Sequence, residues 1–253
     1  MTDFATLLRQ WRRSQRHSQL SLAHEAGISA RHLSFLESAR ARPSRNMVMQ
    51  LAQALDLPRV RVNEFLTAAG FAAAYSQTPL DAEALAPVRA ALERVMENHA
   101  PYPAVLMDRD WGILGMNGAA ERLFGMAGIG MGGSGLALLD LPEGPAAWIE
   151  NWPEVGHHLL TRLEVESRAL GGRRVLDRAA DRLRSDPAVA EFAPEGPLPP
   201  LIPTIYRAGE MRLSLFSTFM QLGGTEDITL SELRVELMFP ADEASKAVLA
   251  AMG

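Results

Sequence analysis

The chain has 253 residues, of which 47% are hydrophobic and 22% charged, proportions typical of a globular protein. It contains no cysteine, which excludes disulfide bonds, thiolate metal sites and thiol nucleophiles. No apolar run is long enough for a membrane span, and the N-terminus lacks the cationic start of an export signal. We therefore expect a cytoplasmic protein without a membrane partner.

The formal net charge of -5 is unevenly distributed along the chain. Residues 1–75 contain ten arginines, no lysine and five acidic residues, so this part carries +5 and the remainder carries -10. A basic N-terminal module on an acidic body predicts a polyanionic partner for the first module only.

The first 70 residues are predicted to form short helices, because apolar residues recur at helical spacing. Gly27, Pro43, Pro58 and Gly70 separate these helices. We therefore predict an all-helical bundle over 1–75.

The pattern changes after residue 75. Residues 81–98 indicate one connecting helix, so we assign 76–98 as a connector. Residues 102–117 give two apolar stretches around Asp108, Arg109 and Asp110, which predicts a β-hairpin, and residues 118–125 return to a helix. Amphipathic helices follow over 145–192. A proline-rich connector over 194–203 leads to strands at 205–222, with a turn inside, and at 228–239.

The last of these segments alternates in polarity. Its apolar residues are Leu233, Val235, Leu237 and Phe239, and its polar residues are Glu232, Arg234 and Glu236. This alternation predicts a strand with one buried face. The fold class is therefore α+β, with an all-helical bundle followed by a mixed domain over 99–253.

The stretch from Gln19 to Glu37 indicates a helix-turn-helix. Ala23 is small where two helices would cross, and Gly27 can adopt the positive φ of a tight turn. In this motif the second helix enters the major groove of DNA with its N-terminal residues against the bases. Arg31 and His32 occupy that tip, and an arginine can donate two parallel hydrogen bonds to guanine.

The remaining candidates for DNA contact lie around this tip. Ser34 and Phe35 come next on the helix, and the predicted phosphate-side residues are Gln19, Ser29, Arg40, Arg42 and Arg45. Two alternatives stay open: the segment is only a helical hairpin with a solvated basic face, and Phe35 is buried.

The sequence also resembles known proteins. "LRQWRRSQRHSQLSLAHEAGISARHLSFLESARARPSRNMVMQLAQALDLP" resembles the DNA-binding domain of the Xre, or lambda-repressor-like, regulators. The DNA-contact positions of that family map onto Gln19, Arg31, His32 and Ser34. The runs "ISARHLSFLESARARPSR" and "FSTFMQLGGTEDITLSELRVELMFPADEAS" are similar to the MmyB-like branch. That resemblance implies a PAS-like ligand-binding domain in the C-terminal half.

A second stretch supports a PAS-like domain. "AVLMDRDWGILGMNGAAERLFG" resembles the opening of PAS domains, in which an Asn stands at the exit of a hairpin, here Asn117. A sheet of this kind leaves an apolar cavity. The branch resemblance implies an apolar ligand such as a fatty acid or an acyl derivative.

Candidate lining residues are bulky or flexible, and candidate head-group partners are cations or hydrogen-bond donors. The candidate lining residues are Met116, Trp148, Trp152, Phe216, Met220 and Met238. The candidate head-group partners are His157, His158, Arg162 and Arg212. The alternatives are that the apolar residues are ordinary core and that the paired histidines lie on the surface. Neighbouring residues of a helix diverge, so we expect no metal site at the histidines and no cofactor.

These features together predict a transcription regulator that binds double-stranded DNA as a homodimer and senses an apolar small molecule. Two rivals stay open. In one, the C-terminal domain only dimerises or recruits a protein. In the other, an enzyme is fused to a DNA-binding domain, which the absence of cysteine and of a histidine–carboxylate constellation disfavours.

Overall fold

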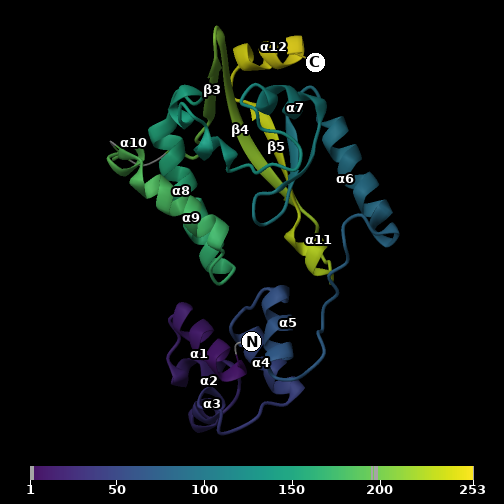
Figure 1. The fold of residues 1–253 in the computed structure, drawn as a ribbon, viewed down its shortest axis with the longest axis vertical. Helices are drawn as coiled ribbons and strands as arrows, with labels where there is room; N and C mark the ends of the chain where they lie inside the picture. The colour runs from purple at the N-terminus through teal and green to yellow at the C-terminus, as the bar shows by residue number, and fades with distance from the viewer. Residues whose placement is uncertain (1–2, 195, 197–198, 253) are drawn as a thin grey trace. The chain divides into compact units, whose positions relative to one another are not determined.

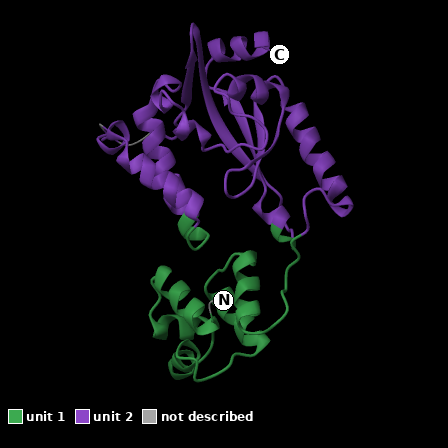
Figure 2. Cartoon of the chain, viewed as in Figure 1, with its two compact units in different colours: residues 1–77, 167–172, 226–228 green, residues 78–166, 173–225, 229–253 purple. Residues whose placement is uncertain are grey.

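The computed structural model describes residues 3–194, 196 and 199–252. Pro197, in the predicted proline-rich connector, lies outside the described residues. The chain divides into two compact units (Figure 2). The first comprises residues 1–77, 167–172 and 226–228, and the second comprises 78–166, 173–225 and 229–253. We name them the N-terminal unit and the C-terminal unit.

The helical part of the N-terminal unit contains α1 (Phe4–Ser14), α2 (Gln19–Glu25), α3 (Ala30–Glu37), α4 (Arg45–Ala54) and α5 (Arg59–Ala68). Polar side chains begin four of these helices. Asp3, Ser18, Ser29 and Ser44 each accept a hydrogen bond from the backbone N–H three residues later. Such caps satisfy N–H groups that a helix leaves without partners in its first turn. The short helices predicted from the sequence are therefore present, each with a defined start.

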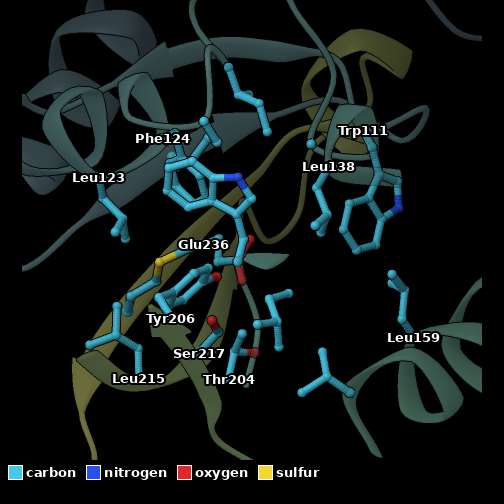
Figure 3. Close-up of a pocket in the computed structure, with 18 of the residues that line it drawn as sticks. Trp111, Leu123, Phe124, Leu138, Leu159, Thr204, Tyr206, Leu215, Ser217 and Glu236 are labelled. Atoms are coloured by element: carbon cyan, nitrogen blue, oxygen red, sulfur yellow. The ribbon is translucent and has the colours of Figure 1, made fainter. Parts of the chain in front are cut away.

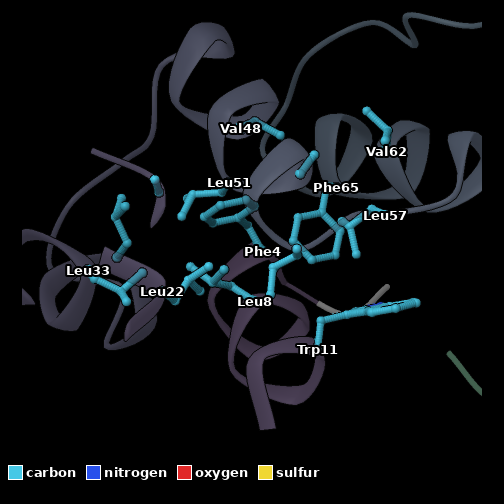
Figure 4. Close-up of a cluster of buried hydrophobic side chains, with 14 of the residues drawn as sticks. Phe4, Leu8, Trp11, Leu22, Leu33, Val48, Leu51, Leu57, Val62 and Phe65 are labelled. Carbon is cyan, nitrogen blue, oxygen red and sulfur yellow. The ribbon is translucent and has the colours of Figure 1, made fainter. Parts of the chain in front are cut away.

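One hydrophobic core joins the five helices (Figure 4). Leu8, Leu33 and Phe65 are fully buried in it, and the Phe4 ring meets the Phe65 ring edge-on with 5.7 Å between centroids. Because α2 and α3 both contribute to this core, their outer faces are held in a fixed orientation.

The C-terminal unit is built on a five-stranded antiparallel sheet with helices on both sides (Figure 1). Its strands are β1 (Ala104–Met107), β2 (Ile113–Met116), β3 (Thr204–Ala208), β4 (Met211–Gln221) and β5 (Arg234–Pro240), in the order β2-β1-β5-β4-β3. Its helices are η1 (Glu83–Leu85), α6 (Ala86–Asn98), α7 (Gly118–Gly125), η2 (Ala137–Asp140), η3 (Pro145–Ala147), α8 (Trp152–Ala169), α9 (Arg174–Ser185), α10 (Pro187–Ala190), α11 (Ile228–Glu232) and α12 (Glu243–Met252). The α+β class is confirmed.

Each face of the sheet packs against a different partner. On one face Leu106 and Val235 pack against Leu92 and Met96 of α6. Side chains alternate along a strand, so their neighbours point to the other face. We name this other face the cavity face, and its residues include Val105, Met107, Thr204, Tyr206, Leu215, Ser217, Phe219, Arg234, Glu236 and Met238.

The structure corrects the prediction for residues 228–239. Ile228–Glu232 forms α11, and the strand begins only at Arg234. The alternation of apolar and polar residues predicted that the polar ones face solvent. Arg234, one of these polar residues, is only 4% exposed, so this face of the strand is not solvated there. The cavity face is covered by α8, so both faces of β5 are enclosed. The helix α12 was not predicted.

Asn117 organises the start of the C-terminal unit. Its side chain is buried at the exit of the β1–β2 hairpin. Its Oδ1 accepts hydrogen bonds from the backbone N–H groups of Ala104 and Ala120, both at 3.0 Å. Its Nδ2 donates to the carbonyl oxygens of Met96 and Tyr102, at 2.9 and 2.8 Å. The amide therefore uses its full hydrogen-bonding capacity to join α6, β1 and α7.

We expect Asn117→Ala to lower the free energy of unfolding by about 2–4 kcal/mol, because it leaves buried N–H and C=O groups without partners. Thermal denaturation of the full chain, followed by circular dichroism, measures this loss. Asn98→Ala, at an exposed position of α6, is the matched control and should leave the midpoint unchanged. Equal midpoints for the two variants would contradict a structural role for Asn117.

Candidate DNA-binding surface and ligand cavity

The turn between α2 and α3 is short and well defined. Gly27 adopts φ +64°, a left-handed conformation that favours glycine. The backbone N–H of Ile28 donates to the carbonyl oxygen of Ala23 at 2.8 Å. Ser29 then begins α3 by accepting a hydrogen bond from the N–H of His32 at 3.1 Å. This geometry places the first turn of α3 at the surface.

Arg31 and His32 lie on that first turn, as the sequence predicted. Arg31 is exposed, and its guanidinium carbon lies 5.4 Å from the centre of the Phe35 ring. Phe35 is half-buried and supports the arginine from one turn further along the helix. The arginine is therefore held at the surface, where its planar group can form two parallel hydrogen bonds to an acceptor pair.

The other predicted DNA contacts occupy different environments. Arg40 and Arg42 are exposed in the segment after α3, whereas Ser34 is half-buried on α3. Arg45 donates through Nη1 to the carbonyl oxygen of Ala72 at 2.7 Å, and Gln19 donates through Nε2 to Glu37 at 2.8 Å. These two side chains therefore already have partners within the N-terminal unit.

Glu37 is the centre of a network that sequence reasoning missed. Its side chain is 3% exposed, and it accepts hydrogen bonds from Nε and Nη2 of Arg12, the latter at 3.0 Å. Arg9 donates to the backbone carbonyl oxygen of Glu37. Burial alone would raise the pKa of Glu37, but the hydrogen bonds from Arg12 and Gln19 outweigh it and hold the pKa below its usual value. Arg12 therefore joins helices and does not add to the exposed basic surface.

The C-terminal unit contains a cavity of about 210 Å³ between the cavity face of the sheet and α8 (Figure 3). Most of its wall is apolar or aromatic. The wall residues from outside the sheet include Trp111, Leu123, Phe124, Leu138, Trp148, His158, Leu159 and Arg162. A largely apolar cavity with a few polar groups is the usual form of a small-molecule site.

Polar side chains occupy the sheet side of this cavity. Figure 3 shows Glu236, Ser217, Thr204 and Tyr206 there. Ser217 forms a hydrogen bond with Glu236, and burial raises the pKa of the Glu236 carboxyl. Burial also raises the pKa of the Tyr206 hydroxyl, so the tyrosine stays neutral at physiological pH.

Two arginines lie at one end of the cavity face. The guanidinium carbon of Arg162 is 4.0 Å from the centre of the Phe219 ring and 4.7 Å from that of Trp111. The guanidinium carbon of Arg234 is 4.5 Å from the centre of the Trp111 ring. Both arginines donate to Glu166 of α8, at 2.8 Å from Nε of Arg162 and 3.0 Å from Nη1 of Arg234.

Residues 88–252 match the family described as the MmyB-like transcription regulator ligand binding domain. This match covers more than half of the chain. Residues 3–65 match a helix-turn-helix domain. The chain belongs to the MmyB-like transcription regulators. It is an Xre-like helix-turn-helix regulator of that branch, which confirms the resemblance seen in the sequence. A search of curated proteins finds no match to the chain.

The structure of this MmyB-like regulator places four of the predicted ligand residues in the cavity wall, namely Trp148, His158, Arg162 and Met238. Phe216 and Met220 instead lie on the α6 side of the sheet. The Phe216 ring stacks on Phe239 with 5.5 Å between centroids, and Met220 packs against the core that includes Leu92.

The other predicted ligand residues also lie outside the cavity wall. Trp152 is buried and donates through Nε1 to Asp186 at 2.8 Å. His157 faces the Phe192 ring at 5.4 Å between centroids, and Arg212 is exposed and paired with Glu150 at 3.0 Å. Met116 is half-buried on β2. Whether any of the predicted residues contacts a ligand stays a prediction.

Sequence reasoning missed Glu236, Tyr206 and Phe219 as cavity residues of this MmyB-like regulator. A signal was present, because residues two apart on β4 and β5 share a face with Ser217 and Met238. Among the described residues, no group of three histidine or acidic side chains is placed to hold a metal ion, and no helix is long and apolar enough to cross a membrane.

Proposed function

We propose that this MmyB-like regulator binds double-stranded DNA as a homodimer through α3 and that an apolar small molecule in the cavity controls this binding. The two matched families support a transcription regulator that responds to a ligand, and neither family description names an enzyme. The exposed Arg31 at the start of α3 carries the DNA-binding proposal. One reading helix covers few base pairs, so two-fold pairing across half-sites would supply the remaining affinity.

The ligand proposed for the cavity is a fatty acid or an acyl derivative. The largely apolar wall supports this class, because burying a hydrocarbon chain stabilises the complex by about 0.8 kcal/mol per methylene group. We also propose three segments, namely a DNA-binding domain over 1–75, a connecting helix over 76–98 and a ligand-binding domain over 99–253. The proposed location is the cytoplasm, where a bacterial transcription regulator binds its DNA.

The test uses the full chain. Native mass spectrometry of the purified protein should detect a bound lipid-like molecule, and removing it should change affinity for the operator in a gel shift. Ala127→Trp, which adds an indole to the cavity wall, should lose the ligand and become insensitive to added lipid extract. Ala250→Trp, on the exposed side of α12, is the control.

The rival proposal makes a different prediction. If the C-terminal unit only dimerises or recruits a protein, no ligand is detected, and operator affinity is the same with and without the extract. That result would exclude the sensor function and leave the DNA-binding function intact.

A further inference from the structure

Phe35 is a large apolar side chain of α3 that takes no part in the hydrophobic core. Leu33 and Leu36 of the same helix are fully buried in that core, and Ala30 packs against it. Phe35 is half-buried, and within the described part of the chain it belongs neither to the core nor to the partly buried side chains packed on it. Among the described residues of α3, it is therefore the one apolar side chain that the packing of the N-terminal unit does not explain.

Phe35 shares one side of α3 with Arg31. Successive residues of an α-helix are about 100° apart, so a residue four positions later lies about 40° from the first. By the same spacing, Leu33 and Leu36 lie about 140–160° from Arg31. The side chains of Arg31 and Phe35 therefore leave the helix together, on the side that faces away from the core.

The Phe35 ring holds the Arg31 guanidinium without using its hydrogen-bond donors. The guanidinium carbon lies 5.4 Å from the centre of the ring, and Arg31 is exposed. Within the described residues, Arg31 forms no hydrogen bond or ion pair. An arginine that is already restricted by an aromatic ring loses less side-chain entropy when it binds a partner. All its N–H groups are thus available to an acceptor outside the protein.

The major groove of DNA presents two groups that match this pair of side chains. Guanine offers two hydrogen-bond acceptors, O6 and N7, and an arginine can bind both with two parallel hydrogen bonds. Thymine offers a C5-methyl group, which is apolar and is contacted by side chains such as phenylalanine. Arg31 and Phe35 together therefore carry the chemistry that recognises one guanine and one thymine.

The spacing of the two side chains along α3 limits the distance between these bases. Four residues of an α-helix rise by about 6 Å, and successive base pairs are about 3.4 Å apart. The contact between the guanidinium and the ring also keeps the ends of both side chains close together. Two adjacent base pairs, or two that are separated by one other pair, satisfy this spacing.

We propose that α3 reads a guanine and a thymine no more than two base-pair steps apart, with Arg31 on the guanine and Phe35 on the thymine methyl group. The proposal rests on the DNA-binding function above and adds the bases that the operator must contain. Phe35 has two roles in it. Its ring contacts the methyl group, and the same ring directs the guanidinium of Arg31 toward the guanine.

The test starts from operators that the full chain itself selects. In vitro selection from duplexes with a random core identifies the bound sequences, and gel shifts measure Kd for one of them. Replacing each guanine in turn by 7-deazaguanine removes the N7 acceptor and keeps the Watson–Crick pair. We expect one position in each half-site at which this replacement weakens wild-type binding about tenfold, and Arg31→Ala should lose the response there.

The second replacement is uracil for thymine, which removes only the C5-methyl group. We expect uracil to weaken binding about fourfold at one thymine within two base-pair steps of that guanine. This fold-change corresponds to the loss of about one buried methyl group. Uracil at thymines on the flanks of the operator should leave Kd unchanged and serves as the control for the replacement itself.

Two substitutions separate the two roles of Phe35, and both should keep the fold because the side chain lies outside the core. Phe35→Ala removes the apolar contact and the ring, so binding should no longer distinguish thymine from uracil, and the response to 7-deazaguanine should fall. Phe35→Leu keeps an apolar side chain without a ring, so the response to uracil should persist while the response to 7-deazaguanine falls. Circular dichroism of each variant checks that the fold is retained.

Leu20→Ala is the matched control variant. Leu20 is an apolar side chain of α2 that is 71% exposed, so its removal also leaves the core intact. Because it lies outside α3, we expect this variant to keep the responses to both base replacements.

Equal binding of the thymine and uracil operators by the wild type, or a uracil response that Phe35→Ala retains, would overturn the inference and leave DNA binding through α3 in place. Selected operators without a guanine that responds through Arg31, or without a thymine within two steps of it, would do the same. Selection of no preferred sequence at all would instead overturn the DNA-binding function on which the inference rests.

Discussion

Replacing Glu37 by alanine should lower the free energy of unfolding of the N-terminal unit by about 3–5 kcal/mol. The substitution leaves the positive charge of Arg12, whose side chain is only 11% exposed, without its ionic partner. It also removes the acceptor of Gln19 and so loosens the link between α2 and α3. Hydrogen exchange of the full chain, resolved by segment, should show faster exchange in α1, α2 and α3.

A second variant and a control define the cause of this loss. Glu25→Ala removes a carboxylate that is 43% exposed and 3.6 Å from His17, so it should change stability by no more than about 0.5 kcal/mol. Replacing Arg12 and Glu37 together by methionine should recover part of the stability, because no unpaired charge stays buried. An unchanged exchange rate in Glu37→Ala would show that the network does not hold the helices together.

Removing the side chains of Arg31 and His32 together should abolish site-specific DNA binding while the fold is retained. Both residues lie on the first turn of α3, outside the hydrophobic core. A bidentate arginine–guanine pair contributes about 1–3 kcal/mol of discrimination, so the loss from Arg31 alone is about five- to 150-fold. Gel shifts on operators identified by genome-wide mapping of bound DNA would measure the change against unrelated DNA.

The phosphate-side arginines should behave differently from this pair. Arg42→Ala should weaken binding to all sequences alike and reduce the salt slope by about one, because each phosphate contact releases counterions. Arg182→Ala, at an exposed position of the C-terminal unit, should have no effect. Full operator selectivity in the Arg31 and His32 double variant would contradict the assignment of α3 as the reading helix.

Local signals were sufficient to predict most elements of the fold. Gly27, Asn117 and the turn at Asp108–Asp110 act over a few residues, and helices and strands occur where these signals place them. The segment 228–239 was only partly predicted, because a short helix precedes the strand. Its alternating pattern is compatible with one solvated face, and only the tertiary position of α8 shows that both faces are enclosed.

The site was less predictable than the fold because it depends on which face each strand residue occupies. Phe216 and Met238 are equally plausible cavity residues in the sequence, yet the β4–β5 register puts them on opposite faces. Charged residues in a strand suggest solvent, so Arg234 and Glu236 gave no indication of a cavity. In α1, the basic residue Arg12 contributed to the predicted DNA-binding charge, although it is paired with Glu37.

The position of β5 in the sheet also bears on how the protein is made. During translation β1 and β2 are synthesised first, followed by β3 and β4. Each of these two pairs can form a hairpin on its own. The strand that joins the two hairpins, β5, is the last to leave the ribosome. Until then β1 and β4 each present an unpaired edge, which is open to association with other chains. The common sheet therefore forms only after β5 has been synthesised, and a chain truncated before residue 234 would keep two separate hairpins without a common sheet.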